Sequence, residues 1–123
     1  MILLDTHIFI WCRMKSRRLP AGIKRAVEKP GIVFVSYLSA WEIALKQSLG
    51  RLEIDESFEE GIARGGFRLL PLSLQQVARL PALPHHHRDP FDRMLICQAL
   101  EEKLILATVD PRFALYGVPL VEG

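Results

Sequence analysis

The sequence predicts an α/β fold in which helices cover both faces of a mostly parallel sheet of about five strands. Short, almost wholly apolar runs recur along the chain, as strands buried on both faces of a sheet require. Segments with the apolar spacing of helices separate these runs, and this alternation is typical of parallel sheets. The runs predict strands over residues 2–4, 32–35, 68–72, 104–108 and 118–121.

An apolar stripe predicts one helix in the first half of the chain. Leu38, Trp41, Leu45 and Leu49 recur at helical spacing, and Gly50 follows them as a stop signal. Weaker patterns of the same period predict further helices over residues 21–28, 57–64 and 73–80.

A second strong helix is predicted to begin at Asp89-Pro90. Aspartate is a favoured N-cap, and proline fits the first helical position, where its missing N–H costs nothing. The apolar pattern that starts at Met94 continues as far as Leu104. We therefore interpret Asp89 as a helix cap.

The composition is that of one soluble globular domain covering residues 1–123. Half of the residues are hydrophobic and 24% are charged, and no apolar run is long enough to span a bilayer. Asp5 interrupts the apolar N-terminus and no basic segment precedes it, so we expect no signal peptide. Cys12 and Cys97 form no CxxC pair, which favours buried thiols. We expect a cytoplasmic protein without membrane contact.

Positive charge is concentrated near the start of the chain, although the whole sequence carries only +2. Residues 1–30 hold seven basic and two acidic side chains, whereas residues 31–123 hold nine basic and twelve acidic ones. A basic segment over residues 13–25 is suited to contact with a phosphate backbone. A solvated surface explains the same charges, and charge alone favours that simpler interpretation.

Four isolated acids stand at the edges of apolar runs, where an unpaired charge is expensive to hold. They are Asp5, Glu42, Asp92 and Asp110. Asp5 and Asp110 follow two predicted strands, and the carboxyl ends of strands are where open α/β sheets build their sites. Carboxylates that converge in this way suggest a divalent cation and hence a metal-dependent enzyme.

Each acid also has an explanation without chemistry. Ser39 and Glu42 have the spacing of a capping box, and Asp92 in the first turn of a helix favours the helix dipole. Asp110 before a proline is suited to a turn. Asp5 alone has no evident local structural role. Their joint occurrence, in the order strand, helix, helix and strand, favours the functional interpretation.

The segments that carry these acids resemble the PIN-domain nucleases, and most closely the VapC-like toxins of toxin–antitoxin pairs. The resemblance covers the whole chain, and its most specific part is the Asp-Pro-Phe-Asp-Arg block at residues 89–93. It implies a single PIN domain over residues 1–123 with a PIN-like α/β/α sandwich. It also implies a metal-dependent endoribonuclease that hydrolyses phosphodiester bonds in tRNA or rRNA.

By this resemblance Asp5, Glu42, Asp92 and Asp110 are the catalytic, metal-binding quartet, with Mg²⁺ or Mn²⁺ as the cation. Oxygen-only ligands suit such hard cations. Lys46 joins the basic groups at residues 13–25 as a candidate for attracting the RNA backbone. The full set of candidate substrate-binding residues is Thr6, Arg13, Lys46, Arg93 and Thr108. For the threonines a strand-end role is equally compatible, and for Arg93 structural pairing is slightly favoured.

The same resemblance implies a cognate antitoxin and a homodimer as partners. Candidate association residues are Phe9, Trp11, Met14, Leu45 and Leu49, although a core position is the simpler expectation for Leu45 and Phe9. Adjacent histidines at 85–87 rarely reach one ion together, and His87 is a candidate for ordering the turn that follows.

Two other functions are compatible with parts of the pattern. A catalytically inert PIN-fold protein-binding module is the main alternative, and the intact acidic quartet argues against it. A phosphatase with a strand-end Asp nucleophile is disfavoured, because His7 stands where that chemistry usually needs a second Asp.

Overall fold

The computed structural model describes residues 1–123 and contains one sheet of four parallel strands. Along the sheet the order is β3-β2-β1-β4, so the first strand of the chain lies between β2 and β4. The strands are β1 (Ile2–Leu4), β2 (Val33–Ser36), β3 (Arg68–Leu70) and β4 (Ile105–Ala107). The α/β fold class and the parallel sheet are therefore as predicted.

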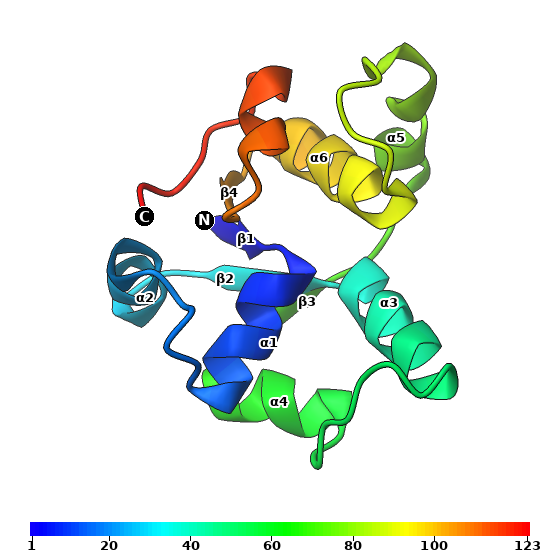
Figure 1. Cartoon of the computed structure of the whole chain (residues 1–123). Helices are drawn as coiled ribbons and strands as arrows, with labels where there is room; N and C mark the ends of the chain where they lie inside the picture. The colour runs from blue at the N-terminus through cyan, green and yellow to red at the C-terminus, as the bar shows by residue number, and fades with distance from the viewer.

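Helices cover both faces of this sheet (Figure 1). On one side lie α1 (Thr6–Met14), α2 (Ala21–Glu28) and α4 (Phe58–Gly65). On the other lie α5 (Leu74–Val77) and α6 (Pro90–Glu102), followed in the chain by the 3-10 helix η2 (Pro111–Tyr116). The remaining long helix, α3 (Tyr37–Ser48), stands beside the end of the sheet. No helix combines the length and the hydrophobicity needed to cross a membrane.

Two apolar cores result from the alternation of side chains along the short strands. In β1, Leu3 belongs to the core beneath α6, whereas Leu4 belongs to the core beneath α1 and α2. Both side chains are fully buried. Helix α3 contributes Leu38 to the first core and Ile43 to the second, so it is anchored from both sides.

The expected fifth strand is reduced to a single bridge, between Leu106 and Leu120. The Leu106 N–H donates to the Pro119 carbonyl at 2.8 Å, and the Val121 N–H donates to the Leu106 carbonyl at 3.0 Å. Pro119 has no N–H with which to extend the ladder. The sheet thus has four strands rather than five, with the C-terminal segment bridged to its β4 edge.

Helix α1 is the main element that the sequence did not predict. Its sequence is rich in β-branched and aromatic residues, which are not strong helix formers. The Asp5 carboxylate accepts a hydrogen bond from the Ile8 N–H at 2.8 Å and caps the first turn. The helix ends at Lys15, which adopts the left-handed conformation with a φ of 51°. Asp5 therefore does have a local structural role, contrary to our expectation.

Two predicted helices differ from their expected form. The helix expected over residues 73–80 is only α5, because Pro81 follows in the 3-10 helix η1 (Leu80–Ala82). Helix α3 begins after Ser36, whose hydroxyl accepts from the Leu38 N–H at 3.0 Å. The capping-box interpretation of Ser39 and Glu42 is therefore wrong, and Glu42 has no role at the helix start.

The candidate association residues fall into two groups. Phe9 is fully buried and Trp11 is half-buried against the core beneath α1, so neither is a free surface. Met14, Leu45 and Leu49 are exposed, which corrects the expectation of a core position for Leu45. The cysteines are free: Cys97 is buried, and Cys12 is half-buried.

Candidate functional site

The four predicted acids come from four different elements. Asp5 directly follows β1, and Asp110 caps η2 after the short loop that leaves β4. Because β1 and β4 pair in parallel, both of these acids lie at the carboxyl edge of the sheet. Asp92 is in the first turn of α6, and Glu42 lies halfway along α3.

Burial and mutual repulsion both act on the carboxyls of this cluster. Burial is the main reason that the pKa of Asp5 is raised. The pKa of Asp92 is raised to about 8, first by burial and then by the negative charges of Asp89, Asp5, Glu42 and Asp110. The fold therefore places the four predicted acids close enough to repel one another, as carboxylates that share a site do.

Glu42 is the most deeply placed of the predicted acids apart from Asp5. Only 5% of the residue is exposed. Its Oε2 pairs with Lys46 Nζ at 3.0 Å, one helical turn away. Its Oε1 is buried and has no hydrogen-bond partner. A buried carboxylate oxygen without a donor is costly, and a cation is the kind of partner that would satisfy it.

Asp110 lies in a contrasting environment because donors surround its carboxylate. Arg112 reaches Oδ1 with its main-chain N–H at 2.9 Å and its Nε at 3.0 Å, and reaches Oδ2 with Nη2 at 2.8 Å. Partial burial acts to raise the pKa of Asp110, but the hydrogen bonds from Arg112 and His87 outweigh it and lower the pKa to about 2.

His87 is a central residue of the site, although the sequence suggested for it only the ordering of the turn that follows. Its Nε2 lies 2.8 Å from Asp110 Oδ2 and 3.2 Å from Asp92 Oδ2. Its Nδ1 accepts from the Asp89 N–H at 3.0 Å, so it orders the turn before α6, as predicted. The signal that was available was its position two residues before the Asp-Pro helix start.

An open cleft of about 480 Å³ connects these groups to solvent. Three of the four acids line it, namely Asp5, Asp92 and Asp110, together with His87. Arg88 and Arg112 also line the cleft, and both are exposed. The cleft thus combines partly buried acidic side chains with exposed cationic ones.

Carboxylate oxygens are the main donors that line the cleft, and this donor set suits a hard divalent cation such as Mg²⁺ or Mn²⁺. The unpaired Oε1 of Glu42 and the raised pKa of Asp92 both mark carboxylates that a nearby positive charge would stabilise. The residues present therefore fit such a metal.

The candidate substrate-binding threonines lie between elements of the site. The Thr6 hydroxyl is 2.9 Å from the Ser39 hydroxyl and links α1 to α3. Thr108 Oγ1 accepts from the Asp110 N–H at 3.0 Å, and its side chain also hydrogen-bonds Asp5. Both residues are buried, and neither lines the cleft.

Arg93 is buried and turned away from the acids. Its Nη1 donates to the Pro84 carbonyl at 2.8 Å, and its Nη2 donates to the Leu83 carbonyl at 3.3 Å. These contacts fix the loop that precedes α6. The structural role favoured for Arg93 is therefore present, although its partners are carbonyls rather than acids.

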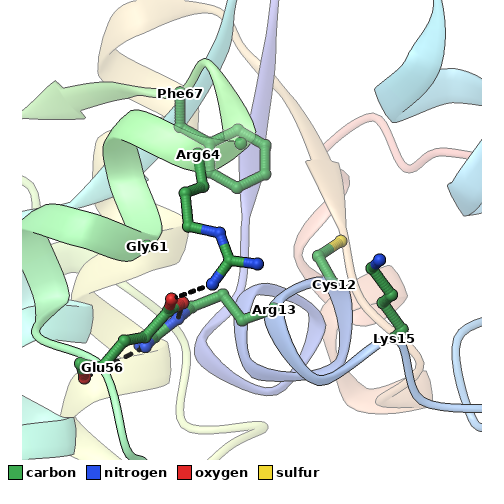
Figure 2. Close-up of a pocket in the computed structure, with 8 residues that line it drawn as sticks. Cys12, Arg13, Lys15, Glu56, Gly61, Arg64 and Phe67 are labelled. Atoms are coloured by element: carbon green, nitrogen blue, oxygen red, sulfur yellow. Dashed lines mark hydrogen bonds and ion pairs between the residues drawn. The ribbon is translucent and has the colours of Figure 1, made fainter.

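Arg13 lies outside the cleft, in a small cavity of about 130 Å³ between α1 and α4. Figure 2 shows its guanidinium and that of Arg64 converging on the carboxylate of Glu56. Arg13 Nε donates to Glu56 Oε1 at 2.8 Å, and only 4% of the Arg13 side chain is exposed. Its guanidinium also lies 5.3 Å from the centre of the Phe9 ring. The structure does not bring Arg13 together with the acids.

The sequence profile of the PIN domain matches residues 2–118, which include all four acids. The chain belongs to the PIN domain family. No curated protein matches the sequence significantly. The PIN assignment nevertheless agrees with the observed fold, a parallel sheet covered by helices on both faces.

Solved structures similar to this PIN domain include components of toxin–antitoxin complexes. FitAcB from Neisseria gonorrhoeae has a TM-score of 0.72 and 20% identity over 99% of this chain and 97% of that chain. VapBC2 from Rickettsia felis, bound to a DNA fragment from its promoter, has a TM-score of 0.69 and 16% identity over 99% and 98%. VapC20 from Mycobacterium tuberculosis, described as a Sarcin-Ricin loop cleaving toxin, has a TM-score of 0.67 and 12% identity over the full length of both chains. These likenesses show the shared fold.

Proposed function

We propose that this PIN domain is a metal-dependent endoribonuclease that acts as the VapC-like toxin of a toxin–antitoxin pair. The observation that carries the proposal is the convergence of Asp5, Glu42, Asp92 and Asp110, from four separate elements, at one edge of the sheet. A fold that needed these acids only as helix caps would not bring them close enough to repel one another, because this repulsion costs stability.

Asp5, Glu42, Asp92 and Asp110 would hold Mg²⁺ or Mn²⁺. Such a cation supplies neutralisation of the phosphodiester charge and activation of a water for attack. The chain supplies the rest of the arrangement. Thr6 and Thr108 fix the elements that carry the acids, and Lys46 balances one oxygen of Glu42 while the other stays unpaired.

The substrate in this proposal is structured RNA, with tRNA or rRNA as the expected class. Arg88 and Arg112 line the cleft and are exposed, so their positive charges would attract the phosphates of RNA bound there. The description of VapC20 as a Sarcin-Ricin loop cleaving toxin supports extending an RNA-cleaving activity to this chain. Arg13 and Arg93 are excluded from the expected RNA contacts because both are buried in structural pairs.

A cognate antitoxin is the expected protein partner, and a cytoplasmic location follows from this role. The structural neighbours VapBC2 from Rickettsia and FitAcB from Neisseria support an antitoxin as partner, since both belong to toxin–antitoxin systems. We also propose a homodimer. The surface of α3 and its C-cap supports the homodimer. Exposed apolar side chains follow one another there at intervals of one helical turn, namely Tyr37, Trp41, Leu45 and Leu49.

The alternative of an inert PIN-fold binding module makes a different prediction about cations. A module that has lost catalysis needs no cation, whereas the nuclease requires Mn²⁺ or Mg²⁺ to bind the acid cluster. A titration with Mn²⁺ that detects no binding would favour the module.

The decisive experiment compares RNA cleavage by the wild type, Asp5→Asn and Asp92→Asn with Mg²⁺ and with EDTA. We expect cleavage by the wild type only with the metal. Each variant should lose about 100-fold or more of the activity, because each removes a charge from the cluster. Asp55→Asn is the matched control, since Asp55 is exposed on the loop before α4. Full activity of Asp5→Asn with Mg²⁺, alongside circular dichroism of a folded protein, would contradict the proposal.

A further inference from the structure

The His87 ring is buried between two of the acids. The residue is only 3% exposed, and Nε2 lies 2.8 Å from Asp110 Oδ2 and 3.2 Å from Asp92 Oδ2. Asp92 belongs to α6, whereas Asp110 belongs to the loop that leads into η2. His87 therefore joins two elements through carboxylates that would otherwise repel each other.

The hydrogen bond at the other ring nitrogen determines where the imidazole proton lies. Nδ1 accepts from the main-chain N–H of Asp89 at 3.0 Å, and a main-chain N–H can only donate. Nδ1 must therefore present its lone pair, and the proton of the neutral ring is on Nε2. Nε2 is thus the donor of the hydrogen bond to Asp110 Oδ2, and the positive end of the same N–H lies beside Asp92 Oδ2.

The surroundings of the ring hold it in this orientation. The His87 N–H donates to the Tyr116 hydroxyl at 2.8 Å, and the Phe113 ring packs edge-on at a centroid distance of 5.7 Å. Arg93 Nη1 lies 3.4 Å from both the His87 carbonyl and the Tyr116 hydroxyl. A ring fixed by two neighbouring elements is suited to setting the positions of the groups it contacts.

We propose that His87 is a positioning residue, whose Nε2–H sets the spacing of Asp92 and Asp110 for the cation. This inference rests on the proposed function and adds a residue to it. The donor offsets the repulsion between the two carboxylates and keeps both turned toward the cleft. His87 itself is not a ligand of the cation, because a ligand at Nε2 would move the proton to Nδ1, against the Asp89 N–H.

The contrasting arrangement, in which Nε2 joins Asp92 and Asp110 as a ligand, is spatially possible because the three donor atoms lie within 4.8 Å of one another. Nitrogen-15 NMR of the protein with saturating Mg²⁺, which is diamagnetic, distinguishes the two through the tautomer. We expect a protonated Nε2 and an unprotonated Nδ1 for His87. A protonated Nδ1 would overturn the proposal, whether or not the protein cleaves RNA.

The second measurement is Mn²⁺ affinity, by titration calorimetry of the wild type, His87→Ala and His87→Gln. Residues that orient metal ligands typically contribute about 10–100-fold to affinity, so we expect His87→Ala to lose at least about 10-fold. His87→Gln keeps an N–H donor and should recover most of that loss. His86→Ala is the matched control, since His86 is exposed and packs on the Tyr116 ring.

The possible outcomes separate this inference from the proposed function. If the wild type binds Mn²⁺ and His87→Ala binds it equally well, the positioning role is wrong and the nuclease proposal stands. If His87→Ala loses affinity and His87→Gln loses as much, hydrogen-bond donation from Nε2 is excluded as the cause of the loss, and the proposed role is wrong. If the wild type binds no Mn²⁺, both the metal centre and this role of His87 are overturned.

Discussion

Asp92 and Asp110 line the same cleft, yet their environments shift their pKa values in opposite directions. Asp92 is surrounded by negative charge, and its pKa is raised to about 8, with burial as the largest cause. Asp110 is surrounded by donors, which hold its pKa at about 2 despite partial burial. Near neutral pH Asp110 is ionised, whereas Asp92 retains a proton unless a cation is bound. Binding of the proposed cation would therefore release a proton, and the affinity for the cation should rise with pH.

The raised pKa of Asp92 has a consequence for stability. In the unfolded chain this carboxyl ionises near pH 4, but in the fold it ionises only near pH 8. The loss of folding stability that this carboxyl causes is absent below pH 4, grows as the pH rises, and is complete above pH 8. In EDTA at pH 8, we expect Asp92→Asn to melt at least about 4 °C above the wild type. Thermal denaturation at pH 4 and pH 8 checks this, and equal melting temperatures at pH 8 would contradict it.

At the residue scale, sequence reasoning found the acids but not the groups that tune them. Asp5, Glu42, Asp92 and Asp110 stand out because a charge beside an apolar run is unusual. Arg112 does not stand out, and His87 stands out only as a residue that orders a turn, because a histidine or an arginine in a polar loop is ordinary. Their importance depends on which atoms they face, and this is decided by the packing of η2 against α6.

At the scale of elements, α1 and α4 are joined by the ion pairs of Glu56. Arg13 and Arg64 bind the same carboxylate, but 4% of the Arg13 side chain is exposed against 68% for Arg64 (Figure 2). Gly61 on α4 leaves the space that Arg13 occupies, since a Cβ there would collide with Nε. Arg13 thus forms a buried ion pair that links the two helices, whereas Arg64 binds the same carboxylate from the exposed side.

This difference predicts unequal effects of two matched substitutions. Arg13→Ala removes a buried, packed side chain, so we expect its melting temperature to fall by about 8 °C or more. Arg64→Ala removes an exposed ion pair and should lower it by less than about 4 °C. Cleavage of RNA below the melting transition should be unchanged in Arg13→Ala. Normal stability together with weakened RNA binding would instead support the substrate role first considered for Arg13.

The elements that the sequence predicted best are those whose signals are local. Strands β1 and β2 are short apolar runs, and α6 starts with a strong cap. Helix α1 was missed because its residues favour strands, and only burial on the sheet and the Asp5 cap make it helical. The apolar row of α3 faces outward because Ser39 and Glu42 take the inner face, and spacing alone does not show which face is buried.

At the scale of the whole molecule, the outward row of α3 predicts self-association. Leu45 is 42% exposed, and Figure 1 shows α3 at the side of the molecule. We expect light scattering after size exclusion to give a dimer for the wild type and a monomer for Leu45→Arg, since a buried unpaired charge opposes association. Leu74→Arg is the control, because Leu74 is 84% exposed on α5, apart from the row. A dimer that survives Leu45→Arg would place the interface elsewhere.

The order of strands in the sheet governs when the cleft can form. Strand β1 is made first, but its neighbour β4 comes almost at the end of the chain. Asp110 is therefore added to the growing chain long after Asp5. Pairings between segments so distant in the sequence form slowly. An incomplete chain on the ribosome carries the first acids without the last one. The acid cluster is therefore complete only once β4 and the segment that follows it have been made.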